Sequence, residues 1–132
     1  MARNPIRRGS ARAHSALVKA CLDYLALEAI PAVPITTTGV PVSVLNGWAR
    51  LKANPAQVGM ADVIGCLPPD GRLLWLECKT GGAVQTREQA ARADQFARSG
   101  ALVIVAGSWE DVRDALTPYL SRPRVVPMRA RA

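Results

Sequence analysis

The sequence predicts an α/β fold in which helices flank a mixed β-sheet. Apolar residues recur at helical spacing near the N-terminus and again after residue 86. Between these segments lie short apolar strands, separated by Asn-Gly and Pro-Pro-Asp-Gly sequences that favour tight turns. The 132 residues allow one domain with a modest core, so we expect a single small α/β sandwich.

The first half of the chain is expected to form one helix and one hairpin. Residues 1–12 show no periodicity and are expected to form a flexible arm. Residues 13–29 carry apolar side chains at helical spacing, and the prolines that follow end this helix. Residues 40–51 are expected to form a hairpin, because Asn46-Gly47 supplies the positive φ angles of a type I′ turn.

The second half is expected to alternate strands and helices. In chain order they are a strand over 62–67, a strand over 73–79, a helix over 86–99, a strand over 101–106 and a helix over 109–120. Thr86 to Gln89 matches a capping box at the start of the first of these helices, and Gly100 suits its end. Ser108 is expected to cap the last helix.

Basic residues are concentrated at the two ends of the chain. The chain carries 17 Lys and Arg against 10 Asp and Glu, a formal charge of +7. Residues 1–19 hold five basic residues and residues 122–132 hold four, whereas all ten acidic residues lie between these ends. Basic ends on a nearly neutral body suit a polyanionic partner such as nucleic acid, although such tails also serve solubility alone.

The cysteine content favours a reducing compartment. Cys21, Cys66 and Cys78 are an odd number in a short chain, which argues against a secreted disulfide scaffold. No apolar run approaches the length of a membrane span, and no signal-peptide core follows the basic start. We therefore expect a cytoplasmic protein of a bacterium, or a phage protein in the host cytoplasm.

The second predicted hairpin brings charged residues to one edge of the sheet. Asp62 opens its first strand, and Glu77 and Lys79 share one face at the end of its second. Cys78 lies between them, so its side chain is expected to join the core on the other face. Two carboxylates held close need a counter-charge, which a divalent cation such as Mg²⁺ supplies. A solvated ion pair at a strand end is the alternative, because Glu-x-Lys is common on surface strands.

Four sequence blocks in a specific order carry a resemblance to a known family. They run from Gly59 to Gly65, from Gly71 to Lys79, from Thr86 to Gln89 and from Gly100 to Ser108. In them the chain resembles the PD-(D/E)xK nuclease superfamily and, within it, the VRR-NUC group of small nucleases similar to Holliday-junction resolvases. The resemblance covers roughly residues 14–116. It implies a restriction-endonuclease-like αβββαβ sandwich with a mixed central sheet flanked by helices.

The resemblance also implies a domain organisation. It consists of a basic flexible arm over residues 1–12, a VRR-NUC-like nuclease domain over residues 13–120 and a basic C-terminal tail over residues 121–132.

A divalent-metal-dependent endonuclease is the activity that this resemblance implies, with Mg²⁺ or Mn²⁺ as cofactor and DNA phosphodiester bonds as substrate. Asp62 and Glu77 match the metal-binding carboxylates, and the backbone carbonyl of Cys78 matches a further metal ligand. Lys79 matches the lysine that helps orient or activate the attacking water and stabilises charge on the phosphate. Gln89 matches a glutamine of the following helix and also completes the capping box, so both of its roles stay open.

Two positions depart from the family pattern. Ala61 stands where the superfamily name has Pro, a residue that ligates nothing. His14 stands where family members carry a Glu on the first helix, and it shares a helical face with Leu17 and Cys21. Imidazole suits Mn²⁺ or Zn²⁺ better than Mg²⁺, so His14 is a tentative metal ligand. A solvent-facing histidine in the first helical turn is the alternative.

Basic residues outside the site are candidates for phosphate contacts that hold the DNA backbone without reading its sequence. They are Arg7, Arg8 and Arg12 in the arm and Arg50 and Lys52 near the first hairpin. The resemblance implies selectivity for branched or flapped DNA. It also implies a homodimer, since two cuts across a junction need two sites.

A non-catalytic or weakly active nucleic-acid-binding module on a nuclease-like fold is the competing interpretation. His14 in place of a carboxylate favours it. A small structural or assembly protein with basic tails is a third interpretation, which leaves the order of the four blocks unexplained.

Overall fold

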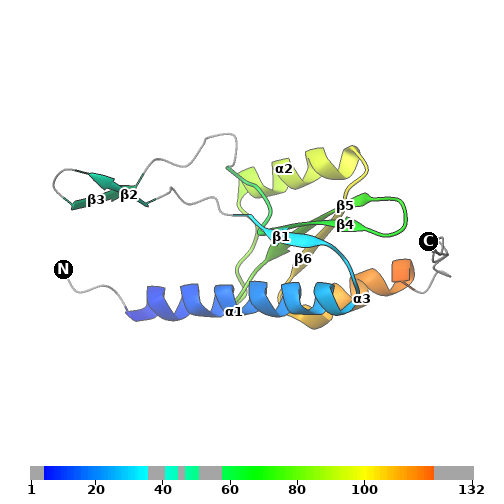
Figure 1. Ribbon diagram of the computed structural model, residues 1–132, viewed down its shortest axis with the longest axis horizontal. Helices are drawn as coiled ribbons and strands as arrows, with labels where there is room; N and C mark the ends of the chain where they lie inside the picture. The colour runs from blue at the N-terminus through cyan, green and yellow to red at the C-terminus, as the bar shows by residue number, and fades with distance from the viewer. Residues whose placement is uncertain (1–4, 36–40, 45–46, 51–57, 121–132) are drawn as a thin grey trace, which may run out of the picture.

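The computed structural model describes residues 5–35, 41–44, 47–50 and 58–120, with side chains described for 11–35 and 58–120. Its helices and strands follow one another along the chain as shown in Figure 1. They are α1 (Pro5–Leu27), β1 (Ala32–Pro34), β2 (Pro41–Val44), β3 (Gly47–Arg50), β4 (Val63–Leu67), β5 (Arg72–Cys78), α2 (Arg87–Arg98), β6 (Leu102–Ala106) and α3 (Trp109–Leu120).

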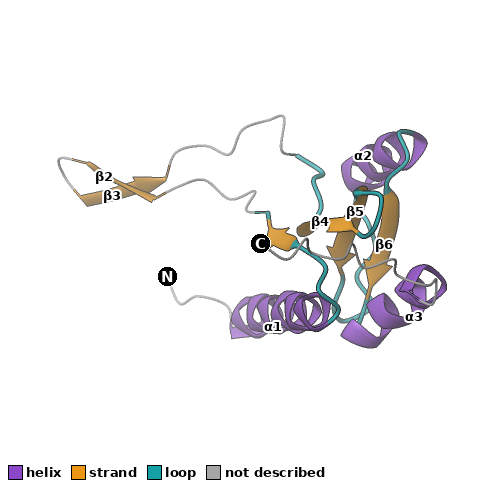
Figure 2. Cartoon of the chain, turned by 45° about the vertical axis from the view of Figure 1, so that its right-hand side comes forward, coloured by secondary structure: helices purple, strands orange, loops and turns teal. Residues whose placement is uncertain are grey.

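The main sheet has four strands in the order β1-β4-β5-β6. The pairs β1–β4 and β4–β5 are antiparallel, whereas β5–β6 is parallel. A parallel pair needs a crossover connection, and α2 provides it here. The sheet is therefore mixed, and with α2 on one face and α1 and α3 on the other it confirms the predicted α/β class (Figure 2).

Side-chain alternation along β5 separates two layers of core. Leu74, Leu76 and Cys78 belong to the layer under α1 and α3. Trp75 belongs to the layer under α2, where its ring centroid lies 4.4 Å from that of Phe96. This alternation confirms the predicted place of Cys78 in the core and leaves the next residue on the Trp75 face, Glu77, under α2.

Helix α1 begins at Pro5, eight residues earlier than predicted, so residues 5–12 of the expected flexible arm are helical. Proline is well tolerated at the first helical position because its missing N–H would have no partner there. The prediction was wrong because apolar periodicity reports which face of a helix is buried, and not whether the chain is helical.

The C-terminal end of α1 is closed by main-chain hydrogen bonds. The Ile30 N–H donates to the Leu25 carbonyl (2.9 Å), and the Ala29 N–H donates to the Ala26 carbonyl (3.0 Å). Ala29 has a φ of +55°, in the left-handed region. These features form a Schellman motif with alanine at the position that glycine usually occupies.

The first predicted hairpin is present as β2 and β3, but its register differs from the prediction. Val44 pairs with Gly47, so Gly47 opens the second strand and does not lie in the turn. Residues 45–46 lie outside the described residues. The hairpin forms its own two-stranded sheet, which lies apart from the main sheet in both views (Figures 1 and 2).

Strand β1 was not predicted. It is three residues long and pairs antiparallel with β4 at the edge of the sheet, where Pro34 is tolerated. With β1 included and the β2–β3 hairpin set aside, the elements from α1 to β6 run helix, three strands, helix, strand. None of the helices in the described ranges is long and apolar enough to cross a membrane.

Replacing Ala29 by glycine should stabilise the protein. A left-handed conformation costs a non-glycine residue about 1–2 kcal/mol, so we expect Ala29→Gly to raise the free energy of unfolding by roughly 1 kcal/mol. Urea denaturation measures this change. The control is Ala16→Gly at an exposed position in the interior of α1, which should lower the free energy of unfolding by about 1 kcal/mol. Destabilisation by both substitutions would contradict the prediction.

Candidate functional site

Asp62 lies where β4 begins, across from the end of β5. The last pair of the β4–β5 register is Val63 with Leu76, and one further step sets Asp62 opposite Glu77. The Asp62 N–H donates to the Leu76 carbonyl (3.0 Å), and the Asp62 carbonyl accepts from the Ile35 N–H (2.8 Å). The main chain of Asp62 is therefore fixed on both sides, and its carboxylate has a defined place.

The carboxylate of Asp62 is held by a main-chain donor and lies beside a histidine. Its Oδ2 accepts a hydrogen bond from the Cys78 N–H (2.8 Å) and lies 3.4 Å from Nε2 of His14. The Asp62 side chain is 27% exposed, and its Oδ1 accepts no hydrogen bond from the described residues. One oxygen of this carboxylate therefore remains available.

The position of His14 overturns one of the two expectations for this residue. Because α1 begins at Pro5, His14 lies in the interior of the helix and not in its first turn. Its imidazole meets Asp62, so it is not a histidine that faces only solvent.

Glu77 is completely buried and is held by neutral donors. Its Oε1 accepts from Nε1 of Trp75 (3.1 Å), and its Oε2 accepts from Nε2 of Gln85 (2.9 Å). No basic side chain of the described residues lies within ion-pair distance of Glu77. Burying a carboxylate without a counter-charge is costly, so the residues that the structure describes leave a need for positive charge here.

The side chains of Lys79 and Gln89 are in contact. Nζ of Lys79 donates to Oε1 of Gln89 over 2.6 Å. The same Oε1 accepts from the Thr86 N–H (2.9 Å), and Oγ1 of Thr86 accepts from the Gln89 N–H (3.1 Å), which completes the capping box. Gln89 therefore completes the expected capping box of α2 and contacts the lysine at the same time.

The thiol of Cys78 belongs to the core. Its Sγ lies 4.0 Å from Sγ of Cys21, and both side chains are buried. The hydrogen bond that it donates to Cys21, together with burial, raises the pKa of Cys78, whereas accepting that bond lowers the pKa of Cys21. The Cys78 thiol therefore stays protonated, and only its main chain can serve the site.

Most of the predicted DNA contacts fall outside what the structure describes. Lys52 lies outside the described residues, and Arg7, Arg8 and Arg50 lie in α1 and β3 without described side chains. Arg12 is exposed on α1, two residues before His14. These contacts stay predictions.

Gln85 is a site residue that sequence reasoning missed. It precedes the Thr86 cap in a loop, and its amide reaches back to Glu77. Trp75 is a second such residue: it shares a face of β5 with Glu77, and its indole N–H donates to the carboxylate. A glutamine in a loop gives no local signal of the partner that its side chain meets.

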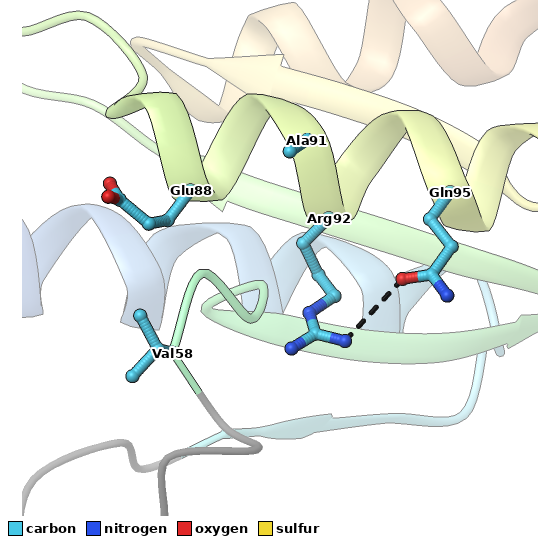
Figure 3. A pocket seen from close by; sticks show the side chains of 5 residues that line it. All are labelled: Val58, Glu88, Ala91, Arg92 and Gln95. Atoms are coloured by element: carbon cyan, nitrogen blue, oxygen red, sulfur yellow. Dashed lines mark hydrogen bonds between the residues drawn. The ribbon is translucent and has the colours of Figure 1, made fainter.

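A hollow of about 280 Å³ lies between α2 and the loop at Val58 and is separate from this site (Figure 3). It is lined by Val58, Glu88, Ala91, Arg92 and Gln95 (Figure 3). None of the residues gathered around Asp62 and Glu77 contributes to it, although Glu88 is the sequence neighbour of Gln89.

The chemistry of the site carries the functional argument, because no family model, curated protein or solved structure matches the chain at a significant level. Among the described residues, no three or more His, Cys, Asp and Glu side chains form a group that could hold a metal ion. A cation between Asp62 and Glu77 would therefore also depend on main-chain oxygens and water.

The loop before Asp62 should tolerate no side chain at Gly59. This glycine has a φ of +77°, and a Cβ there would lie 2.6 Å from the Glu88 carbonyl oxygen, in the first turn of α2. The left-handed conformation costs an alanine about 1–2 kcal/mol, and forcing the helix away adds roughly 1–3 kcal/mol.

A matched control separates these two contributions. Gly82 has a φ of +73° but nothing within 4 Å of the added Cβ, so Gly82→Ala should show only the conformational cost. Thermal and urea denaturation compare the two variants. Equal destabilisation by Gly59→Ala and Gly82→Ala would show that the contact with α2 does not matter.

Proposed function

We propose that this protein is a divalent-metal-dependent endonuclease that hydrolyses DNA phosphodiester bonds, with selectivity for branched or flapped structures. The observation that carries the proposal is the set of three charged residues at one end of the neighbouring strands β4 and β5: Asp62 across from Glu77, and Lys79 two residues further along the chain. The lysine is held by a glutamine of the next helix.

We also assign the chain to the restriction-endonuclease-like fold and to the VRR-NUC group of PD-(D/E)xK nucleases. The order from α1 to β6, without the β2–β3 hairpin, agrees with the αβββαβ sandwich of that superfamily. The cysteine content supports a cytoplasmic location, because it suits a reducing compartment.

The donor set suits a hard divalent cation such as Mg²⁺ or Mn²⁺. Asp62, Glu77 and the Cys78 carbonyl would supply oxygen ligands, and His14 lies close enough to Asp62 to be a further candidate. Each carboxylate oxygen accepts more than one bond, so the hydrogen bonds already made do not prevent ligation. When bound, a divalent cation polarises a phosphoryl oxygen and makes water a better nucleophile at neutral pH.

Lys79 supplies positive charge at the reacting phosphate. Its ammonium group donates to a neutral amide and not to a carboxylate, so its charge is not cancelled within the described residues. Gln89 fixes the ammonium, and the capping box in turn fixes Gln89. A charge held in place before the reaction stabilises the negative charge that develops on the phosphate.

The basic ends of the chain would hold the DNA backbone. Because contacts of this kind release counterions, DNA binding should weaken steeply as salt is raised. We propose a homodimer as the form that cuts a junction, because two cuts need two sites.

A DNA-binding module without activity is the second candidate. Both oxygens of Glu77 already accept hydrogen bonds, and a histidine stands at the position of the first-helix carboxylate. Calorimetric titration with Mn²⁺ separates the two candidates. DNA binding without Mn²⁺ binding and without cleavage would support the module and overturn the nuclease.

Cleavage should depend on Asp62 and Lys79. Asp62→Asn removes a ligand charge and Lys79→Ala removes the charge beside the phosphate, so each should lower the cleavage rate by about 100-fold or more. The assay uses branched and linear DNA with Mg²⁺ or Mn²⁺. Asp70→Asn, an exposed acid in the β4–β5 turn, is the control for lost charge and should cut like wild type. If the site variants also cut like wild type, the site assignment is wrong.

Replacing His14 by glutamate tests its place in the site. If the position binds the cation, His14→Glu supplies a harder ligand and should keep or raise Mg²⁺-dependent cleavage relative to Mn²⁺-dependent cleavage. The measurement is the ratio of the two rates. A severe loss of Mg²⁺-dependent cleavage in a variant with native circular dichroism would count against His14 as a ligand position.

A further inference from the structure

We propose that Gln85 is a positioning residue for Glu77: with Trp75 it clamps both carboxylate oxygens through neutral donors, and it thereby sets the affinity of the site for a divalent cation. The inference rests on the proposed function, because it concerns the same cation. It adds a residue that the sequence pattern did not assign to the site.

The geometry of the clamp is complete. Trp75 donates to Oε1 of Glu77 over 3.1 Å, and Gln85 donates to Oε2 over 2.9 Å. Trp75 is fully buried and packs against Phe96, so its indole N–H cannot follow a moving carboxylate. With one oxygen tied to a rigid ring and the other to a loop, Glu77 has one orientation.

The loop that carries Gln85 gives no other reason for this orientation. Its neighbour Val84 is 81% exposed and Thr86 is also exposed, yet Gln85 is half-buried. Thr86 caps α2 and fixes the main chain directly after Gln85. The side-chain amide of Gln85 donates to Glu77. The carboxylate, and not apolar burial, therefore accounts for the inward position of the Gln85 side chain.

The chemistry of the donors matters as much as their position. An arginine or lysine in place of Gln85 would neutralise Glu77 and compete with a cation. An amide and an indole satisfy the hydrogen bonds of the buried carboxylate but leave its negative charge uncompensated. Partners that orient ligands in this way typically contribute about 10–100-fold to metal affinity.

The test measures binding of Mn²⁺ alone, from the electron paramagnetic resonance signal of the free ion. Gln85→Leu removes the amide that donates to Glu77 and keeps a side chain of similar size. It should raise the Kd for Mn²⁺ by about 10–100-fold. Gln95→Leu, a glutamine on the exposed side of α2, is the matched control and should leave the Kd unchanged. Melting temperature and circular dichroism report whether each variant is folded.

The possible outcomes separate this inference from the proposed function. If wild type binds Mn²⁺ and folded Gln85→Leu binds it equally well, the role of Gln85 is refuted and the nuclease proposal stands. If wild type binds no Mn²⁺, both fail. If Gln85→Leu loses the native circular dichroism spectrum, the Kd for Mn²⁺ is measured on Gln85→Ala instead, because the smaller alanine side chain cannot clash with the loop. An unchanged Kd in that variant refutes the role of Gln85.

Discussion

From Leu74 to Cys78, strand β5 exposes at most 1% of any residue, on either face of the sheet. Four of these five residues are apolar or a thiol, and the fifth is Glu77. Strand β5 is paired on both sides, so main-chain hydrogen bonds of the sheet support its interior. The burial of the Glu77 carboxylate is therefore the constraint that the surrounding side chains must meet. Trp75 and Gln85 meet it with hydrogen bonds, but neither supplies charge.

Other parts of the site follow from where β5 places that carboxylate. The Glu77 side chain lies on the same face of the sheet as Trp75, and α2 covers this face through Ala93 and Phe96. The start of α2 therefore lies over the end of β5, and the capping box there directs Gln89 at Lys79. Gly59 allows the loop before Asp62 to approach the same helix turn. Packing of one apolar layer thus brings together the end of β5, the start of α2 and the loop before Asp62.

Local signals predicted the second half of the fold well and the first half less well. The starts of α2 and α3 could be predicted because each is capped by a residue no more than four positions away in the sequence. The caps are Thr86 with Gln89 for α2 and Ser108 for α3. The first turns of α1 and the short strand β1 carry no such signal. Gln85 points inward because of a partner eight residues away, and local pattern does not encode this contact.

The pairing of charges distinguishes a binding site from a structural ion pair. In an ion pair that serves stability alone, Lys79 would meet Glu77 or Asp62. In the described residues Lys79 instead meets the amide of Gln89, Glu77 meets an indole and an amide, and Asp62 meets a main-chain N–H and His14. A carboxylate that is buried without a counter-charge, as Glu77 is among the described residues, costs folding stability. On the proposed function, this cost is offset by a ligand that carries both complementary charges, and a phosphate accompanied by a divalent cation is such a ligand.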